Sequence, residues 1–355
     1  IKKLNRRDFI DRMRSNESLA GTLATLEVQV GWHYLMNYLE KLDAVTPEDI
    51  RRAAAKYIQT ENKTSAYVIP GGQPDGPPES YSEVRSITGS GAVKSDRPHD
   101  FSNISRYPTP VGWKHPLSFQ RQPKKIEYPQ AKTMDIADTR VFYLSDHELP
   151  LVDLTLLVKA GSVDVDDSRI GLAALLTDSI IRGGTETRSP AELARVLDEN
   201  AIHLSVAVGE EEAVIRLSVL KDDWQSGLAI LQEILTRPAF DAGVLDVVKT
   251  QQLTELKRQG GNAQAVAGRE RDIWYFKGHP YGRDPLAGLQ SIPLIGREDL
   301  KQFLRDYFVP SNMVAAIAGD IDREDVKAGL SQFFKALPQT RAPQRNLSDP
   351  AETPP

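Results

Sequence analysis

The feature that most constrains the fold of this chain is a long segment, residues 71–125, rich in residues that interrupt regular structure. Of its 55 residues, 22 are proline, glycine or serine, and no apolar period runs through it. A structureless stretch of this length inside one compact domain would be unusual. We therefore predict a linker at residues 71–125, with separate folded segments before and after it.

The segment before this linker, residues 1–70, predicts helices followed by one strand. Apolar residues follow helical spacing from Ser18 to Leu42. A further helix start is marked by Thr46 as N-cap, Pro47 at the first helical position and Asp49 at the capping-box position. Residues 64–69 have the composition of a short strand. Since these elements are too few for a domain core, we interpret residues 1–70 as the C-terminal part of a preceding domain.

The segment after the linker, residues 126–340, predicts one complete α+β domain with a mostly antiparallel sheet. Hairpins alternate with runs of helices, which is not the order of a doubly wound parallel sheet. Ser189, Pro190 and Glu192 mark a helix start with a capping box. Strand patterns cover 141–144, 152–156, 204–208, 214–219 and 313–318, and helical patterns cover 171–181, 224–235, 244–258, 263–276, 300–308 and 325–334. Residues 341–355 are read as the start of the next linker.

Composition excludes several classes of protein and site. A net charge of −5 argues against a protein that coats nucleic acid, because phosphate binding needs a basic face. No apolar run is long enough for a transmembrane helix. The absence of cysteine removes disulfides, thiolate nucleophiles and Cys-ligated zinc. None of the six histidines forms an i,i+4 pair, so a zinc site built on a helical His pair is not predicted in this chain.

Other short motifs are read as structural. The Gly-Gly pairs 71–72, 183–184 and 260–261 lack the ending of a phosphate-binding loop and predict turns or helix C-caps. Asp164, Asp166 and Asp167 lack the spacing of a calcium-binding EF-hand loop, so they are interpreted as a solvated loop.

Several ordered pieces of residues 126–340 resemble the pitrilysin/insulysin family of zinc metallopeptidases, the inverzincins. The pieces are Val158-Lys159-Ala160-Gly161-Ser162, Gly171 through Asp178 leading to Arg182-Gly183-Gly184-Thr185, His279-Pro280-Tyr281-Gly282, and Asp299-Leu300 through Tyr307 to Met313. Residues 18–70 resemble the closing helices and last strand of a preceding domain of the same family. The resemblance covers about three-quarters of the chain and implies repeated α+β peptidase-family domains, one partial and one complete.

The resemblance also locates a departure from the family's active site. Active members carry H-x-x-E-H, two zinc-ligating histidines with a general-base glutamate, on one helix. Those positions are occupied here by Ala174, Thr177 and Asp178. The third family ligand aligns with Glu255, which we interpret as a solvated remnant. The resemblance therefore implies no catalytic residue, no bound cofactor and no metal in this chain.

Within this family the resemblance implies a non-catalytic half of a zinc metalloendopeptidase, an internal fragment of a longer chain and inactive on its own. Its expected partners are a peptide or unfolded-protein substrate and an upstream catalytic half that holds the zinc. A periplasmic or secreted location is expected, because bacterial relatives are often exported. A peptidase-fold scaffold or binding protein with no proteolytic domain is the main alternative. A third is a divergent enzyme that uses Asp178, Glu255 and a metal other than zinc.

Overall fold

The computed structural model describes residues 1–60, 63–64, 112, 114, 128–345 and 347. Contacts divide the chain into two compact units, one made of residues 1–45 and 129–355 and the other of residues 46–128. The predicted domain limits at residues 70, 125 and 340 stay a prediction. The predicted strand at 64–69 and most of the predicted linker lie outside the described residues.

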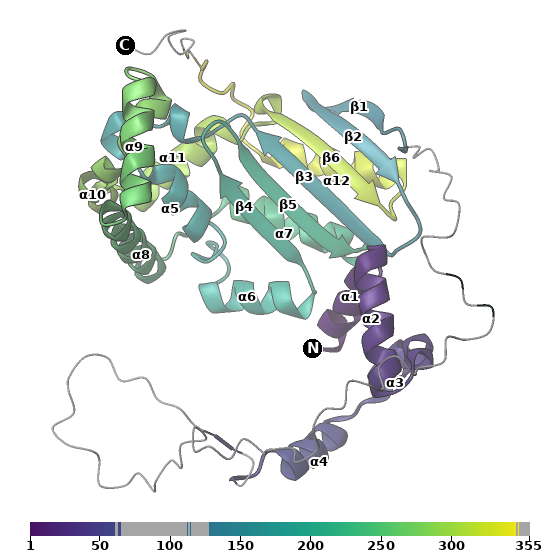
Figure 1. Cartoon of the computed structure of the whole chain (residues 1–355). Helices are drawn as coiled ribbons and strands as arrows, with labels where there is room; N and C mark the ends of the chain where they lie inside the picture. Colours follow the sequence, from purple (N-terminus) through teal and green to yellow (C-terminus); the bar gives the residue numbers. More distant parts are fainter. Residues whose placement is uncertain (61–62, 65–111, 113, 115–127, 346, 348–355) are drawn as a thin grey trace, which may run out of the picture. The chain divides into compact units, whose positions relative to one another are not determined.

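The larger unit is built on one six-stranded mixed sheet (Figure 1). Its strands are β1 (Lys132–Ile136), β2 (Thr139–Ser145), β3 (Leu151–Val158), β4 (His203–Val208), β5 (Ala213–Leu220) and β6 (Met313–Gly319). They lie in the order β1-β2-β6-β3-β5-β4, and only the β2–β6 pair is parallel. This arrangement confirms the predicted α+β class.

The helices of the larger unit fall into three groups. At the N-terminus are α1 (Lys2–Arg12), α2 (Asn16–Gln29) and α3 (Tyr38–Ala44). Figure 1 shows α7 (Trp224–Thr236) and α12 (Arg323–Ala336) lying along the sheet. The same figure shows the third group gathered at one end of the sheet: α5 (Leu172–Ser179), α8 (Ala242–Gly260), α9 (Ala263–Tyr275), α10 (Gly288–Ser291) and α11 (Arg297–Tyr307). Helix α6 (Pro190–Glu199) lies apart from this group, below β4 in the view. No helix in the described part of the chain is both long and apolar enough to cross a membrane.

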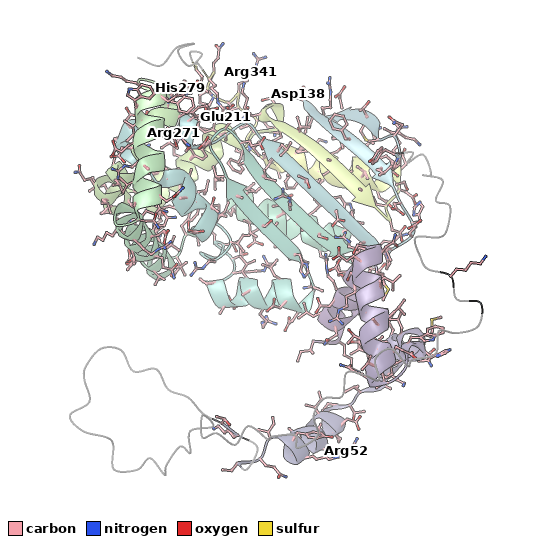
Figure 2. The ribbon with its side chains drawn as sticks, in the orientation of Figure 1. Arg52, Asp138, Glu211, Arg271, His279 and Arg341 are labelled. Atoms are coloured by element: carbon pink, nitrogen blue, oxygen red, sulfur yellow. The ribbon has the colours of Figure 1, made fainter. Side chains whose placement is uncertain are left out.

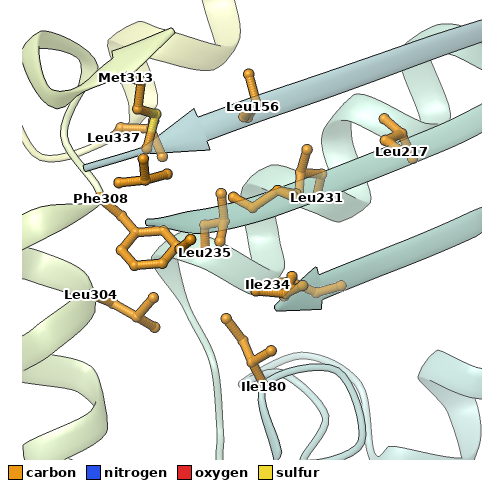
Figure 3. Packing of buried hydrophobic residues seen from close by; sticks show 14 of the residues in the cluster. Leu156, Ile180, Leu217, Leu231, Ile234, Leu235, Leu304, Phe308, Met313 and Leu337 are labelled. Atoms are coloured by element: carbon orange, nitrogen blue, oxygen red, sulfur yellow. The ribbon is translucent and has the colours of Figure 1, made fainter. Parts of the chain in front are cut away.

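The core lies between the sheet and the helices that cover it. Strand β5 alternates Ile215 and Leu217, which are buried, with Arg216 and Ser218, which are more exposed. Figure 3 shows side chains of α7, α11 and β6 meeting in this core. The set labelled there comprises Leu156, Ile180, Leu217, Leu231, Ile234, Leu235, Leu304, Phe308, Met313 and Leu337.

Two local features differ from the sequence prediction. The helical pattern from Ser18 to Leu42 is interrupted, because α2 ends at Gln29 and Gly31 adopts a φ of +86°, which an α-helix does not accommodate. A short 3₁₀ turn over Trp32–Asn37 then leads into α3. Strand β1 was not predicted, since its sequence Lys-Thr-Met-Asp-Ile alternates too weakly to stand out.

Helix starts follow the predicted capping chemistry. The Ser189 side chain accepts a hydrogen bond from the Glu192 N–H, and the Glu192 carboxylate accepts one from the Ser189 N–H. The second unit contains α4 (Pro47–Tyr57), which begins with the same reciprocal bonds between Thr46 and Asp49. The bond from the Thr46 N–H, together with bonds from the Thr46 hydroxyl and Arg52, lowers the pKa of Asp49 to about 2, so its carboxylate stays ionised at the positive end of the helix dipole.

Candidate functional site

Helix α5 carries three of the four residues singled out from the sequence. Leu175, Leu176 and Ile180 are buried against the core, which fixes the rotation of the helix. Ala174 and Asp178, one turn apart, are consequently exposed on the opposite face.

A cavity of about 650 Å³ lies beside this face of α5. Ala174 and Asp178 line it from α5, and Glu255 lines it from α8 together with Gln252. The end of β4 at Val208 and the loop that follows it complete this wall. The structure therefore brings Ala174, Asp178 and Glu255 to one concave surface, although Glu255 lies far from α5 in sequence.

The two carboxylates of the cavity are held by neighbouring side chains. Asp178 Oδ2 accepts a hydrogen bond of 3.0 Å from Gln252 Nε2. Glu255 accepts two hydrogen bonds from Arg258, at 2.9 and 2.7 Å, and one from Gln259 at 3.0 Å. The bonds from Arg258 are the main cause of a lowered pKa at Glu255. The negative charge of this carboxylate is therefore already paired with a positive charge on the same helix, α8.

Thr177 is not among the residues that line the cavity, and its side chain has a structural role. Its hydroxyl donates to the Ala173 carbonyl at 3.1 Å and accepts the Val208 N–H at 2.8 Å. Val208 is the last residue of β4, which is an edge strand of the sheet. The side chain at the family's general-base position therefore satisfies a backbone group of the sheet edge.

The Thr177 hydroxyl makes a testable contribution to stability. In Thr177→Val the half-buried Val208 N–H loses its acceptor, and we expect the free energy of unfolding to fall by about 1–2 kcal/mol. Thr177→Ser keeps the hydroxyl and is expected to retain most of that stability. Urea denaturation followed by circular dichroism measures both variants, and equal midpoints for Thr177→Val and the parent chain would contradict this assignment.

The donor set at this position does not fit a catalytic zinc ion. Ala174 has no ligating atom, Thr177 is engaged with β4, and the carboxylates of Asp178 and Glu255 are hydrogen-bonded to amide and guanidinium groups. Catalytic zinc sites use three protein ligands, mainly histidine with one carboxylate. No group of three or more His, Cys, Asp or Glu side chains in the described ranges could hold a metal ion.

Residues adjacent in sequence to the cavity lining make contacts that the sequence did not reveal. The side chain of Asp164, read from the sequence as part of a solvated loop, is instead only 5% exposed. Arg345 reaches it from beyond α12 and donates through Nε at 2.9 Å and through a second, shorter contact. Arg345 also donates to the Glu211 carbonyl at 2.6 Å. A bidentate arginine thus joins the loop after β3 to the β4–β5 turn.

Aromatic side chains add to these contacts. Tyr281 donates to the Glu211 carboxylate, and its ring lies edge-on to His279 at 4.4 Å between centroids. Figure 2 shows Glu211 and His279 at the same end of the molecule. Tyr307 donates to the Asp164 carbonyl at 3.2 Å, and burial, followed by the nearby Asp164 carboxylate, raises the pKa of its phenol.

The glycine motifs in the described residues occupy turns and helix ends. Gly183 follows α5, and its N–H donates to the Ser179 carbonyl at 2.7 Å while its carbonyl accepts from the Asp241 N–H at 2.9 Å. Gly260 is the last residue of α8, and Gly261 is its C-cap. These positions agree with the predicted turn and C-cap, whereas the pair at 71–72 lies outside the described residues.

Comparisons with family models place this site in a known context. The model of insulinase (peptidase family M16) matches residues 140–284, which contain α5, most of the residues that line the cavity, and most of the sheet. The model of the peptidase M16 inactive domain matches residues 295–355. Both matches agree with the resemblance identified from the sequence.

Individual relatives include peptidases and a protein described as not a peptidase. The non-peptidase homolog YmxG of Helicobacter pylori is 28% identical over 206 residues, which cover 58% of this chain and 48% of YmxG. The probable mitochondrial-processing peptidase subunit beta of Schizosaccharomyces pombe is 26% identical over 193 residues, covering 54% of this chain and 42% of that protein. The chain spans about half the length of the curated relatives it matches.

Solved structures show the same fold. A peptidase M16 inactive domain from Pseudomonas fluorescens superposes with a TM-score of 0.58 at 27% identity, covering 63% of this chain and 54% of that chain. The first half of the periplasmic protease PqqL from Escherichia coli gives a TM-score of 0.54 at 20% identity, covering 63% and 50%. The second likeness concerns the fold alone.

Proposed function

We propose, from the premise that this chain belongs to the insulinase (M16) family of peptidases, that it is the non-catalytic half of a zinc metallopeptidase of that family. In this role it binds extended peptide and forms part of the chamber wall, and an upstream half of the same protein holds the zinc. The observation that carries the proposal is the cleft between α5 and α8, which keeps its concave shape while its family ligand positions hold Ala174 and Asp178.

The order of the N-terminal helices supports the presence of a preceding repeat. Helices α1, α2, α3 and α4 follow one another as α8, α9, α10 and α11 do. The N-caps Ser15 and Asn262 are 247 residues apart, and the N-caps Thr46 and Gly296 are 250 apart. Both of the latter helices carry an aspartate at the third position, Asp49 and Asp299, which accepts a hydrogen bond from the N-cap N–H. Residues 1–57 thus repeat the order of residues 242–307.

Strand β4 supports the peptide-binding part of the proposal. N–H groups alternate in direction along a strand, so those of Leu204 and Val206 point to the same outer side as that of Val208. A second cavity, of about 420 Å³, lies at the Leu204 end, and the α5–α8 cavity lies at the Val208 end. A peptide added to this edge would bond to the outward groups of Leu204 and Val206, because the Val208 N–H is bonded to Thr177, and would place side chains toward both cavities.

The test is a scan with modified peptides. A short fluorescein-labelled peptide from denatured casein is titrated with the chain, and each peptide N–H is methylated in turn. Strand addition predicts that methylation at alternate positions weakens binding by roughly tenfold or more, while intervening positions have little effect, because only every second peptide N–H faces β4. Binding that is absent, or equally sensitive at every position, would refute peptide binding at this edge.

A second candidate function is a scaffold or binding protein that keeps the peptidase fold in every domain without proteolysis. The likeness to the non-peptidase homolog YmxG favours it. Extending the reading frame upstream by about 400 residues, roughly two domains, separates the two candidates. An intact H-x-x-E-H followed by a downstream glutamate supports the peptidase half, whereas a second degenerate motif supports the scaffold.

The location proposed for the parent protein is the periplasm. The supporting observation is the fold shared with the periplasmic protease PqqL. Immunoblotting of osmotic-shock fractions from the source cells tests this location, and recovery of the protein only in spheroplasts would contradict it.

A further inference from the structure

The most deeply buried charged side chain in the described residues belongs to α1. Arg7 is 1% exposed, although it comes from a short N-terminal helix rather than from the core of the domain. Its Nη1 donates to the carbonyls of Ala201, at 2.9 Å, and Ser218, at 2.6 Å. Its Nη2 donates to Ser218 Oγ at 2.5 Å. An arginine buried to this extent needs hydrogen-bond acceptors for most of its N–H groups. Two separate segments of the chain provide them, and we call these acceptors the Arg7 cradle.

The receptor for Arg7 is a corner of the sheet. Ser218 is in β5, and Ala201 lies just before β4 begins at His203. The Ser218 hydroxyl in turn donates to Asp153, which lies opposite it on β3. Burial, and next to it the positive charge of Arg7, lower the pKa of His203 at the same corner, which keeps this imidazole neutral near pH 7.

Other residues of α1 and its end complement this corner. Lys3, Arg7 and Ile10 are spaced at intervals of four and three, so they share one face of α1, and Arg14 lies two residues after the helix ends. Lys3 Nζ lies 2.7 Å from Asp223 Oδ1, and Arg14 pairs with Asp153. Ile10 packs against Leu151 and Leu220. Asp11, on the same face of α1, pairs with Arg7 Nε and with Arg14. The face is therefore mainly cationic, with one apolar and one acidic residue, and the receptor is anionic with an apolar strip.

We propose that this corner of the sheet is a docking site for an arginine-bearing helix, and that docking of α1 holds residues 1–45 on the unit of residues 129–345 independently of the chain that connects them. The contact would thus hold residues 1–45, the end of one proposed repeat, on residues 129–345, which form the next. Lys3 and Arg14 contribute orientation through partly exposed ion pairs, whereas Arg7 contributes most of the affinity because its cradle excludes water. Lysine cannot replace it, since one ammonium group cannot span two carbonyls and a hydroxyl.

The experiment uses the full chain with a site-specific protease sequence inserted between Ser90 and Gly91. Because the chain has no cysteine, Glu17→Cys provides a single site for a fluorescent dye on exposed α2. After cleavage, fluorescence anisotropy on serial dilution measures how tightly the two pieces remain associated. We expect the parent chain to stay associated at micromolar concentration, and Arg7→Ala to weaken association at least roughly 100-fold.

Matched variants separate docking from folding. Arg12→Ala removes an exposed arginine from the same helix and is expected to leave association unchanged within about threefold. Arg7→Lys and Ser218→Ala are each expected to weaken it by about tenfold or more. Circular dichroism of each uncut variant verifies that the fold is retained. Separation of the pieces of the parent chain on cleavage, or undiminished association of Arg7→Ala or Arg7→Lys, would overturn the proposal.

Discussion

Replacing Gly319 by alanine is expected to lower the stability of the larger unit strongly. Gly319 ends the central strand β6 with a φ of +130°, a conformation that side chains disfavour. A Cβ added there would lie 2.0 Å from the Leu151 carbonyl oxygen and 3.0 Å from Val152 Cα. Both are backbone atoms of the neighbouring strand β3, so no side-chain rotation relieves the overlap. Strain and overpacking together predict a loss of about 3–5 kcal/mol from the free energy of unfolding, a large fraction of a typical domain's stability.

The measurement is thermal unfolding of Gly319→Ala monitored by circular dichroism. We expect the midpoint to fall by about 10 °C or more. Gly268→Ala is the matched control, because its added Cβ would meet no atom within 4 Å on the exposed helix α9. That substitution is expected to leave stability unchanged or to raise it by up to about 1 kcal/mol, since alanine favours helix over glycine. Equal midpoints for the two variants would show that the β3–β6 backbone can move to accept a methyl group.

The parts of the fold that the sequence predicted are those in which local pattern and burial agree. Strands β4 and β5 alternate and are separated by a short polar turn, and α6 begins with a complete capping box. Both were therefore predictable from spacing alone. Strand β1 was missed because it is a short edge strand with mixed polarity, and its pairing with β2 depends on a tight turn at Ala137 and Asp138. Such pairing depends on tertiary contacts, which the local pattern of apolar and polar residues indicates only weakly.

Only those residues of the candidate site that match the positions of zinc ligands in the family motif were predictable from the sequence. The resemblance pointed to Ala174, Asp178 and Glu255, and the structure places all three on one cavity. The contacts of Arg7 with Ser218 and of Arg345 with Asp164 were not predictable, because they join residues 211 and 181 positions apart. Nothing in the local sequence distinguishes these two arginines from exposed ones. Their importance arises from the acceptors that the folded chain brings to them.

The geometry of the cavity leads to a second large expected effect, a gain of metal binding. The double variant Ala174→His/Asp178→His places two imidazoles one helical turn apart on the exposed face of α5. Glu255 lies on the same cavity, and we expect it to become a third ligand by giving up its hydrogen bonds from Arg258 and Gln259. We expect zinc affinity to rise at least about 100-fold over the parent chain, equivalent to about 2.8 kcal/mol. Thr177 is kept in this variant, because its hydroxyl satisfies the Val208 N–H.

Competition with a chromophoric zinc chelator measures this gain, and adding Glu255→Gln to the double variant provides the control. Loss of the third ligand is expected to reduce the gained affinity by about tenfold. Binding should also weaken below about pH 6, because protonated imidazole cannot ligate zinc. A folded double variant that binds zinc no better than the parent chain would show that α5 and α8 are not set at the family's spacing. A gain that is unaffected by Glu255→Gln would instead remove Glu255 from the site. The expected pattern requires that the backbone positions of the family's metal ligands are retained and that only the ligating side chains have been lost. A degenerate domain, in physical terms, is one that meets both conditions.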